Sequence, residues 1–93
     1  MNKPIFENLK YGDKLVKMNH DGSYSLYEYL CRDPHWKEKY AFLLCQDGSN
    51  TVHINSFRIE SEFLVYNSFE EVKKYAHTKR AEYCRNWLNK HHK

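Results

Sequence analysis

The hydrophobic period of the chain changes near Ser68, and this change limits the folds that the sequence can adopt. Before Ser68, apolar residues occur in short runs separated by turn residues, which is typical of β-strands. After it, apolar residues recur at helical spacing. The charge changes at the same place, because residues 1–66 hold 8 Lys/Arg and 9 Asp/Glu whereas residues 67–93 hold 7 and 3. The sequence therefore predicts a near-neutral, strand-rich body followed by a basic helix.

Length and composition restrict the class of protein. The 93 residues are expected to form one domain over 1–93, and a chain of this size buries only roughly 60–65% of its unfolded surface. Aromatic residues make up 16% of the chain, which argues against disorder. No apolar run approaches the ~20 residues that span a bilayer, and residues 1–6 lack the apolar segment of a signal peptide.

The cysteines indicate the redox environment. Cys31, Cys45 and Cys84 are odd in number and irregular in spacing, which argues against a disulfide framework. We therefore expect a cytoplasmic protein without a membrane segment, in which these cysteines lie in apolar surroundings and behave as small hydrophobic residues.

Turn residues divide the body into five expected strands. Asn19–Gly22 and 47–50 are hairpin turns, and a Pro-containing loop occupies 33–38. The second and third strands carry apolar residues on both faces, so both faces of the sheet should be covered. The expected strands are Lys14 to Met18, Ser23 to about Arg32, Tyr40 to Cys45, Thr51 to Asn55, and about Glu62 to Tyr66.

The helix is expected to begin at Ser68 and to run to about Lys90. Ser68 followed by Glu71 fits a capping box, and acidic residues in the first turn suit the helix dipole. One apolar face is predicted to pack on the sheet, with Trp87 as its anchor, so that Trp87→Ala should cost roughly 3–5 kcal/mol. This face consists of Phe69, Val72, Ala76, Tyr83 and Trp87, with Cys84 at its margin.

Five strands, two tight turns and a terminal helix predict a small α+β protein. The expected architecture is a strongly bent, five-stranded antiparallel sheet or barrel with the C-terminal helix packed on it. Residues 9–16, Leu-Lys-Tyr-Gly-Asp-Lys-Leu-Val, resemble the "L-x-x-G-D-x-h-V" entry into the first strand of SH3-like small barrels. This resemblance implies a fold that binds peptides or nucleic acids and seldom catalyses a reaction, although fold alone does not fix function.

The loop around Trp36 is the first candidate binding site. Trp36 lies between His35 and Lys37, where little of the local sequence can bury its ring, and loops often carry binding residues. Tyrosines on the strands, including Tyr27 and Tyr29, could extend this surface by stacking on bases or holding a peptide. Core packing is the favoured interpretation of these strand tyrosines, which are Tyr24, Tyr27, Tyr29 and Tyr40.

The basic helix is the second candidate, as a nucleic-acid contact. Clustered cations gain free energy by releasing counterions from phosphates. At ~100° per residue, however, Lys74 and Arg85 share one side and Lys79 lies on another, while Lys73 and Arg80 border the apolar face. A solvated helix is therefore favoured over a basic stripe. The charged or titratable residues concerned are Lys73, Lys74, His77, Lys79, Arg80, Arg85, Lys90, His91 and His92.

Metal and catalytic sites are not favoured by the motifs. Zinc sites normally show close ligand pairs, and the residues available here (Cys31, His35, Cys45, His53 and Cys84) offer only Cys31 with His35. The chain has no nucleophile elbow, phosphate-binding glycine loop or H-E-x-x-H sequence. No metal, cofactor or catalytic residue is therefore predicted.

Two classes of function remain after these exclusions. The leading hypothesis is a small non-enzymatic protein-binding module of the adaptor or inhibitor type, which uses the Trp36 loop or an exposed strand edge. The alternative is a nucleic-acid-binding module that uses the basic helix through Lys74, Lys79 and Arg85; the net charge of +3 permits this without requiring it. Self-association through an open strand edge is a further expectation.

Overall fold

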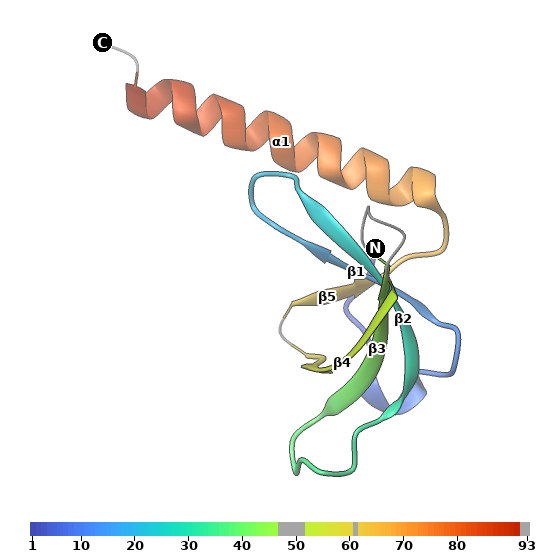
Figure 1. The fold of residues 1–93 in the computed structure, drawn as a ribbon. Helices are drawn as coiled ribbons and strands as arrows, with labels where there is room; N and C mark the ends of the chain where they lie inside the picture. Colours follow the sequence, from blue (N-terminus) through green and yellow to red (C-terminus); the bar gives the residue numbers. More distant parts are fainter. Residues whose placement is uncertain (47–51, 61, 92–93) are drawn as a thin grey trace.

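Five antiparallel strands and one long helix make up the structure (Figure 1). The computed structural model of the chain describes residues 1–46, 52–60 and 62–91. In these ranges the strands form one sheet in the order β4-β3-β2-β1-β5, which confirms the expected α+β class. The elements are the 3-10 turn η1 (Phe6–Asn8), β1 (Lys14–Met18), β2 (Tyr24–Arg32), β3 (Tyr40–Gln46), β4 (Val52–Arg58), β5 (Phe63–Val65) and α1 (Phe69–His91).

The strand boundaries follow the turn residues closely. β1 has the predicted bounds, β2 and β3 differ from prediction by one residue at one end, and β4 runs to Arg58 rather than ending at Asn55. The predicted turn at 47–50 lies outside the described residues. β4 and β5 are the two edges of the sheet, so the sheet is strongly bent but not closed into a barrel.

The segment that resembles an SH3-like entry forms a tight turn before β1. Gly12 adopts a positive φ of 91°, and the Asp13 side chain accepts a hydrogen bond of 2.8 Å from the Lys10 amide. The turn is joined to β2, because the Gly12 amide donates to the Tyr29 carbonyl and the Tyr29 amide donates to the Asp13 carbonyl. Glycine is favoured at such a position because a Cβ atom makes this φ costly.

The main core fills the concave, inner face of the bent sheet. Successive strand residues point to opposite faces, so Ala41 and Leu43 of β3 point inward and are fully buried. Aromatic rings meet edge to face in this core, with Tyr27 5.2 Å from both Phe57 and Phe63. The buried members of the core are Phe6, Leu15, Tyr29, Ala41, Leu43, Ile59 and Phe63.

The first half of α1 packs on the opposite, outer face of the sheet. Val16 of β1 is fully buried although it lies outside the main core, and Val72 and Ala76 are the buried residues of the helix. The β1–β2 hairpin turn supports the helix directly at Gly22, which has a φ of 88°. A Cβ atom at Gly22 would lie 2.8 Å from the Ala76 carbonyl oxygen and from Arg80 Cβ. The absence of a side chain therefore allows the two backbones to approach.

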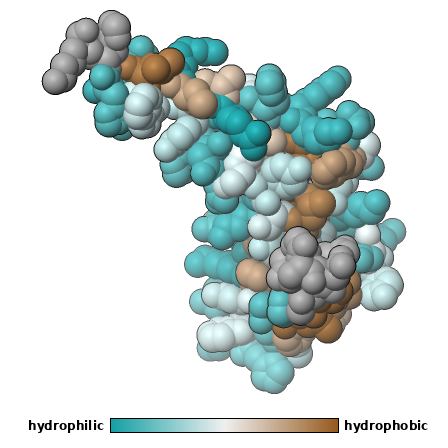
Figure 2. Space-filling model, turned by 45° about the horizontal axis from the view of Figure 1, so that its top comes forward, coloured by the Kyte–Doolittle hydropathy of each residue, from teal (hydrophilic) through white to brown (hydrophobic). Residues whose placement is uncertain are grey.

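The prediction that Trp87 anchors the helix on the sheet is wrong. Trp87 is 50% exposed and Leu88 is 59% exposed, and every residue from 81 to 91 is exposed. The physical reason is length: 23 residues of helix extend for about 35 Å. The supporting hairpin contacts α1 near Ala76 and Arg80 and, through the His20 ring, at Tyr83, which precedes Trp87 by one turn. The second half projects beyond the sheet (Figure 1), and hydrophobic surface is visible near its tip (Figure 2).

Two cysteines also differ from expectation. Cys31 and Cys84 are exposed, and only Cys45 is partly buried. Cys84 lies in the projecting half of α1, and Cys31 lies on β2 beyond a register shift between Tyr29 and Cys31. They are therefore not held in apolar surroundings as predicted.

The start of α1 has the predicted cap. The Glu71 amide donates to Ser68 Oγ at 3.4 Å, and Glu71 Oε2 accepts from the Asn67 amide at 3.1 Å. The reciprocal bond of the capping box thus reaches one residue further back than the standard pattern. Among the described residues, no helix combines the length and the apolar character that crossing a membrane requires.

Candidate functional site

A strip of apolar side chains remains open on the outer face of the sheet. Because Ala41 and Leu43 point inward, the alternating residues Tyr40, Phe42 and Leu44 of β3 point outward, where they are half-buried. Ile54 of β4 pairs with Leu44 in the sheet register and is 60% exposed. We call Trp36, Tyr40, Phe42, Leu44 and Ile54 the outer strip; α1 lies over the β1–β2 hairpin and leaves this strip uncovered.

The ring of Trp36 forms one end of the outer strip. It stacks on Tyr40 with 5.0 Å between the ring centroids and 24° between the planes, and half of its surface is exposed. The stacked pair lies beside β4, because Tyr40 pairs with Arg58. The expectation that little of the local sequence covers Trp36 agrees with this exposure.

A buried carboxylate holds the loop that carries Trp36. Asp33 is 3% exposed, and its Oδ1 accepts the His35 amide at 3.0 Å and lies 2.8 Å from His35 Nδ1. Its Oδ2 accepts from Ser56 Oγ of β4 at 2.6 Å. These bonds, the Ser56 bond above all, hold the pKa of the Asp33 carboxyl below its usual value of 3.8. The ionised carboxylate therefore fixes the loop to the sheet.

An ion-pair bridge holds the other end of the same loop. Lys39 Nζ lies 2.7 Å from Glu60 Oε1 and 3.1 Å from Glu7 Oε1. The two hydrogen bonds to these carboxylates, first that to Glu60, raise the pKa of Lys39 above its usual value. The loop is therefore attached at both ends, and an aromatic ring on a fixed loop loses little conformational freedom on binding.

The strand next to the outer strip has an open edge. β4 lies at the end of the sheet order, and its residues Val52 to Asn55 are all exposed. Edge strands are often protected by lysine or proline, yet β4 contains neither residue. Within the described ranges, β4 pairs with β3 and has no strand on its other side.

The sequence-predicted contacts divide between several places in the structure. His35, Trp36 and Lys37 are exposed on the loop at the end of the molecule farthest from α1 (Figure 1). Tyr29 is 7% exposed and belongs to the core. Tyr27 is half-buried, and burial, followed by the neighbouring Cys45, raises the pKa of its phenol. The core interpretation of the strand tyrosines therefore holds for Tyr29, and the ring of Tyr27 packs against the same core while the residue stays partly exposed.

The predicted basic contacts of α1 do not form one surface. Lys74 and Arg85 are exposed and share one side of the helix, as expected from their spacing. Lys79 is half-buried on another side, and its Nζ lies 5.5 Å from the centre of the Tyr75 ring. These three cations are therefore dispersed.

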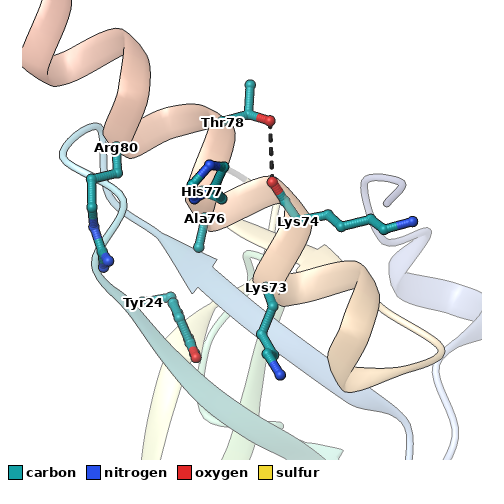
Figure 3. Close-up of a pocket in the computed structure, with 7 residues that line it drawn as sticks. All are labelled: Tyr24, Lys73, Lys74, Ala76, His77, Thr78 and Arg80. Atoms are coloured by element: carbon teal, nitrogen blue, oxygen red, sulfur yellow. Dashed lines mark hydrogen bonds between the residues drawn. The ribbon is translucent and has the colours of Figure 1, made fainter.

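A crevice beside α1 collects a set of basic residues that shares Lys74 with the three cations above. It has a volume of about 650 Å³, and the side chains of Lys73 and Arg80 extend from α1 toward the strand that carries Tyr24 (Figure 3). Of the described residues that line it, none is Asp or Glu. These lining residues are Tyr24, Lys73, Lys74, Ala76, His77, Thr78 and Arg80.

Sequence reasoning missed these two surfaces for different reasons. The signal for the outer strip was present, because the third strand has no polar position from Tyr40 to Cys45, but we expected the helix to cover it. The signal for the crevice was the spacing of Lys73, His77 and Arg80, which places them on one side of a helix. We had interpreted Lys73 and Arg80 as the border of a packed apolar face.

The polar cluster at Asp33 is arranged for structure rather than for nucleophilic catalysis. In a catalytic triad, histidine lies between the hydroxyl and the carboxylate and takes the hydroxyl proton. Here Asp33 lies between Ser56 and His35, and Ser56 donates to the carboxylate itself. Within residues 1–46, 52–60 and 62–91, no group of three or more His, Cys, Asp or Glu side chains is placed to hold a metal ion.

Comparisons with known proteins were made at three levels. No protein-family model, no curated protein and no solved structure matches the chain.

Proposed function

We propose that this chain is a small, cytoplasmic, non-enzymatic module that binds a protein partner through the outer strip. The observation that carries the proposal is the row of outward-facing apolar side chains that ends in the half-exposed ring of Trp36. Apolar surface that is contiguous, rather than scattered, marks interaction sites on soluble proteins. The binding energy of such interfaces is concentrated in a few residues, among which tryptophan and tyrosine are enriched.

The open edge of β4 supports an extended partner segment. A peptide that adds to the sheet beyond β4 would hydrogen-bond along this edge and place alternate side chains over Ile54 and toward Trp36. A second copy of the chain that pairs through its own β4 edge is the homodimer version of the same proposal.

The three cations first assigned to the nucleic-acid alternative do not form one contact surface. Lys74, Lys79 and Arg85 point to more than one side of α1, so they do not match the continuous phosphate backbone of a duplex. Polar loop contacts that were predicted beside Trp36, from His35 and Lys37, fit a protein partner because they border the ring as a polar rim.

Affinity capture with matched variants tests the proposal. The immobilised wild-type protein, Trp36→Ala, Ile54→Lys and Tyr11→Ala are each exposed to lysate, and the retained proteins are quantified by mass spectrometry. Tyr11 is 78% exposed and lies outside the outer strip, so Tyr11→Ala is the control for loss of an exposed ring. A specific partner should be retained by wild type and by Tyr11→Ala, and lost with Trp36→Ala through an affinity loss of roughly 2 kcal/mol or more.

The Ile54→Lys variant tests whether the partner uses the β4 edge in addition to the Trp36 ring. Lysine on an edge strand opposes strand addition, so this variant should also lose the partner if an extended segment pairs with β4. If the partner is a second copy, sedimentation of the purified protein should show a dimer that Ile54→Lys converts to a monomer. Retention of the same proteins by Trp36→Ala and by wild type would contradict the proposed site.

A further inference from the structure

We infer that the crevice between α1 and β2 binds single-stranded nucleic acid, an activity separate from the protein binding proposed above. The first argument is the sign of the charge. Lys73, Lys74, His77 and Arg80 line the crevice, and none of its described lining residues is acidic. A cleft lined by one sign of charge concentrates ligands of the opposite sign.

The acidic residues of α1 do not neutralise the side of the helix that faces the crevice. Glu71 is engaged elsewhere, because its carboxylate accepts from the Asn67 amide and pairs with the amino group of Met1 at 3.2 Å. Glu82 lies two residues from Arg80, so it points about 200° around the helix. Glu70 is the acidic neighbour of the crevice, with Oε1 3.4 Å from Lys73 Nζ. Both side chains of this pair are more than half exposed, so the pair is weak and a phosphate can compete for the lysine.

The side of α1 that carries the basic residues of the crevice carries aromatic residues in the projecting half. Residues 73, 77, 80, 84, 87 and 91 follow the spacing that places side chains on one side of a helix. Trp87 is half-exposed on this side and lies 4.3 Å from His91 between ring centroids. Trp87 lies seven residues beyond Arg80, which is about 10 Å along the axis. An aromatic ring on which a base can stack thus lies on the same side of the helix, about two turns beyond the crevice.

The aromatic rings favour a single strand over a duplex. Tyr24 lines the crevice and is packed edge to face against Phe69, with 6.3 Å between the centroids. The Tyr24 ring lies between the side chains of Lys73 and Arg80 (Figure 3), and Trp87 lies further along the helix beyond Arg80. Proteins that bind single strands without sequence preference combine a basic groove with such stacking rings. The bases of a duplex are already stacked on each other, so these rings would contribute nothing to duplex binding.

Fluorescence anisotropy with defined oligonucleotides tests the inference. The probes are fluorescein-labelled oligo(dT) and oligo(U) of about 15 nucleotides and a duplex of the same length. Purified wild-type protein should bind both single strands, more weakly at about 200 mM than at about 50 mM salt. The double variant Lys73→Gln with Arg80→Gln should lose at least about tenfold in affinity, and its salt slope should fall by about 0.7 for each lost phosphate contact.

Two control variants distinguish the crevice from general electrostatic attraction. Lys10→Gln with Lys14→Gln removes the same charge from exposed positions of the body, and it should retain affinity within about threefold. Trp87→Ala should weaken binding about fivefold or more without changing the salt slope, and Trp87→Phe should restore it. The inference is overturned if neither single strand binds, if both double variants lose affinity equally, or if the duplex binds as tightly as the single strands.

Discussion

The two halves of α1 carry similar apolar spacing but lie in different surroundings. In the first half, Val72 and Ala76 are buried against the outer face of the sheet. In the second half, Tyr83 and Trp87 continue the same spacing, yet they are exposed. The difference arises because the β1–β2 hairpin supports the helix near Ala76 and Arg80, and touches the second half through the pair of His20 with Tyr83, whose rings lie 5.7 Å apart. An apolar helical face therefore shows that a contact is favoured, but not that the same chain supplies it.

The largest expected loss of stability comes from disturbing the contact between Gly22 and the first half of α1. Gly22→Ala adds a Cβ atom 2.8 Å from the Ala76 carbonyl oxygen and places alanine at a φ of 88°. The strained backbone and the overpacking should together lower the free energy of unfolding by about 2–4 kcal/mol. Urea denaturation measures the change. A loss below about 0.5 kcal/mol would show that the helix does not rest on this turn.

A smaller loss of stability is expected from a cavity between the first half of α1 and the sheet. Val72 is fully buried, and Val72→Ala removes two methyl groups from its contact with the sheet. The lost burial and the remaining cavity should cost about 2 kcal/mol, measured by the same denaturation. His77→Ala is a control in the same half of the helix, because His77 is exposed and should change stability by less than about 0.5 kcal/mol. Equal effects of the two variants would contradict the packing described.

Acid should remove the stabilisation that the Glu71 carboxylate provides at the start of α1. The Asn67 amide and then the Met1 amino group hold the pKa of Glu71 below its usual value of 4.5. Because the folded-state pKa is the lower one, this carboxylate contributes stability above about pH 4.5, and the contribution is lost as pH falls through the folded-state value. Melting temperatures measured from pH 6 to pH 3 should therefore converge for wild type and Glu71→Gln at the acidic end. A constant difference between them would exclude this carboxylate as the cause.

The smallest expected change in stability comes from Trp87→Ala in the second half of α1. Trp87 is 50% exposed, so Trp87→Ala should change the free energy of unfolding by less than about 0.5 kcal/mol. This value differs clearly from the 3–5 kcal/mol expected from the sequence pattern for a buried anchor. Trp36→Phe leaves Trp87 as the remaining tryptophan, whose emission should be that of a solvent-exposed ring. A large loss of stability in Trp87→Ala would show that the second half has a partner in solution.

The strands and the start of the helix could be predicted because local residues determine them. Asn19–Gly22 fixes the hairpin, Ser68 caps the helix, and both signals act within four residues of the feature that they specify. The outer strip could not be predicted in the same way. Whether Phe42 and Leu44 are covered depends on where α1 crosses the sheet, and a contact distant in sequence, between Gly22 and Ala76, determines that crossing.

The binding residues were predictable only where exposure follows from local sequence. Trp36 lies in a short loop with polar neighbours, and its ring is half-exposed as expected. Tyr29 has the same chemistry on a strand, but the bend of the sheet places it in the core. Lys73 and Arg80 were assigned to the border of a packed face, but their side chains line a crevice beside Tyr24 of β2.

The contact at Gly22 makes the free half of α1 a lever. From Tyr83, which packs against His20 of the hairpin, the helix runs 8 residues to its end at His91, which is about 12 Å. A tilt of about 10° at the hairpin would therefore move the tip by about 2 Å. Small changes of packing at the hairpin are amplified at Trp87, so a ligand that spans the crevice and the tip would sense the conformation of the β1–β2 turn.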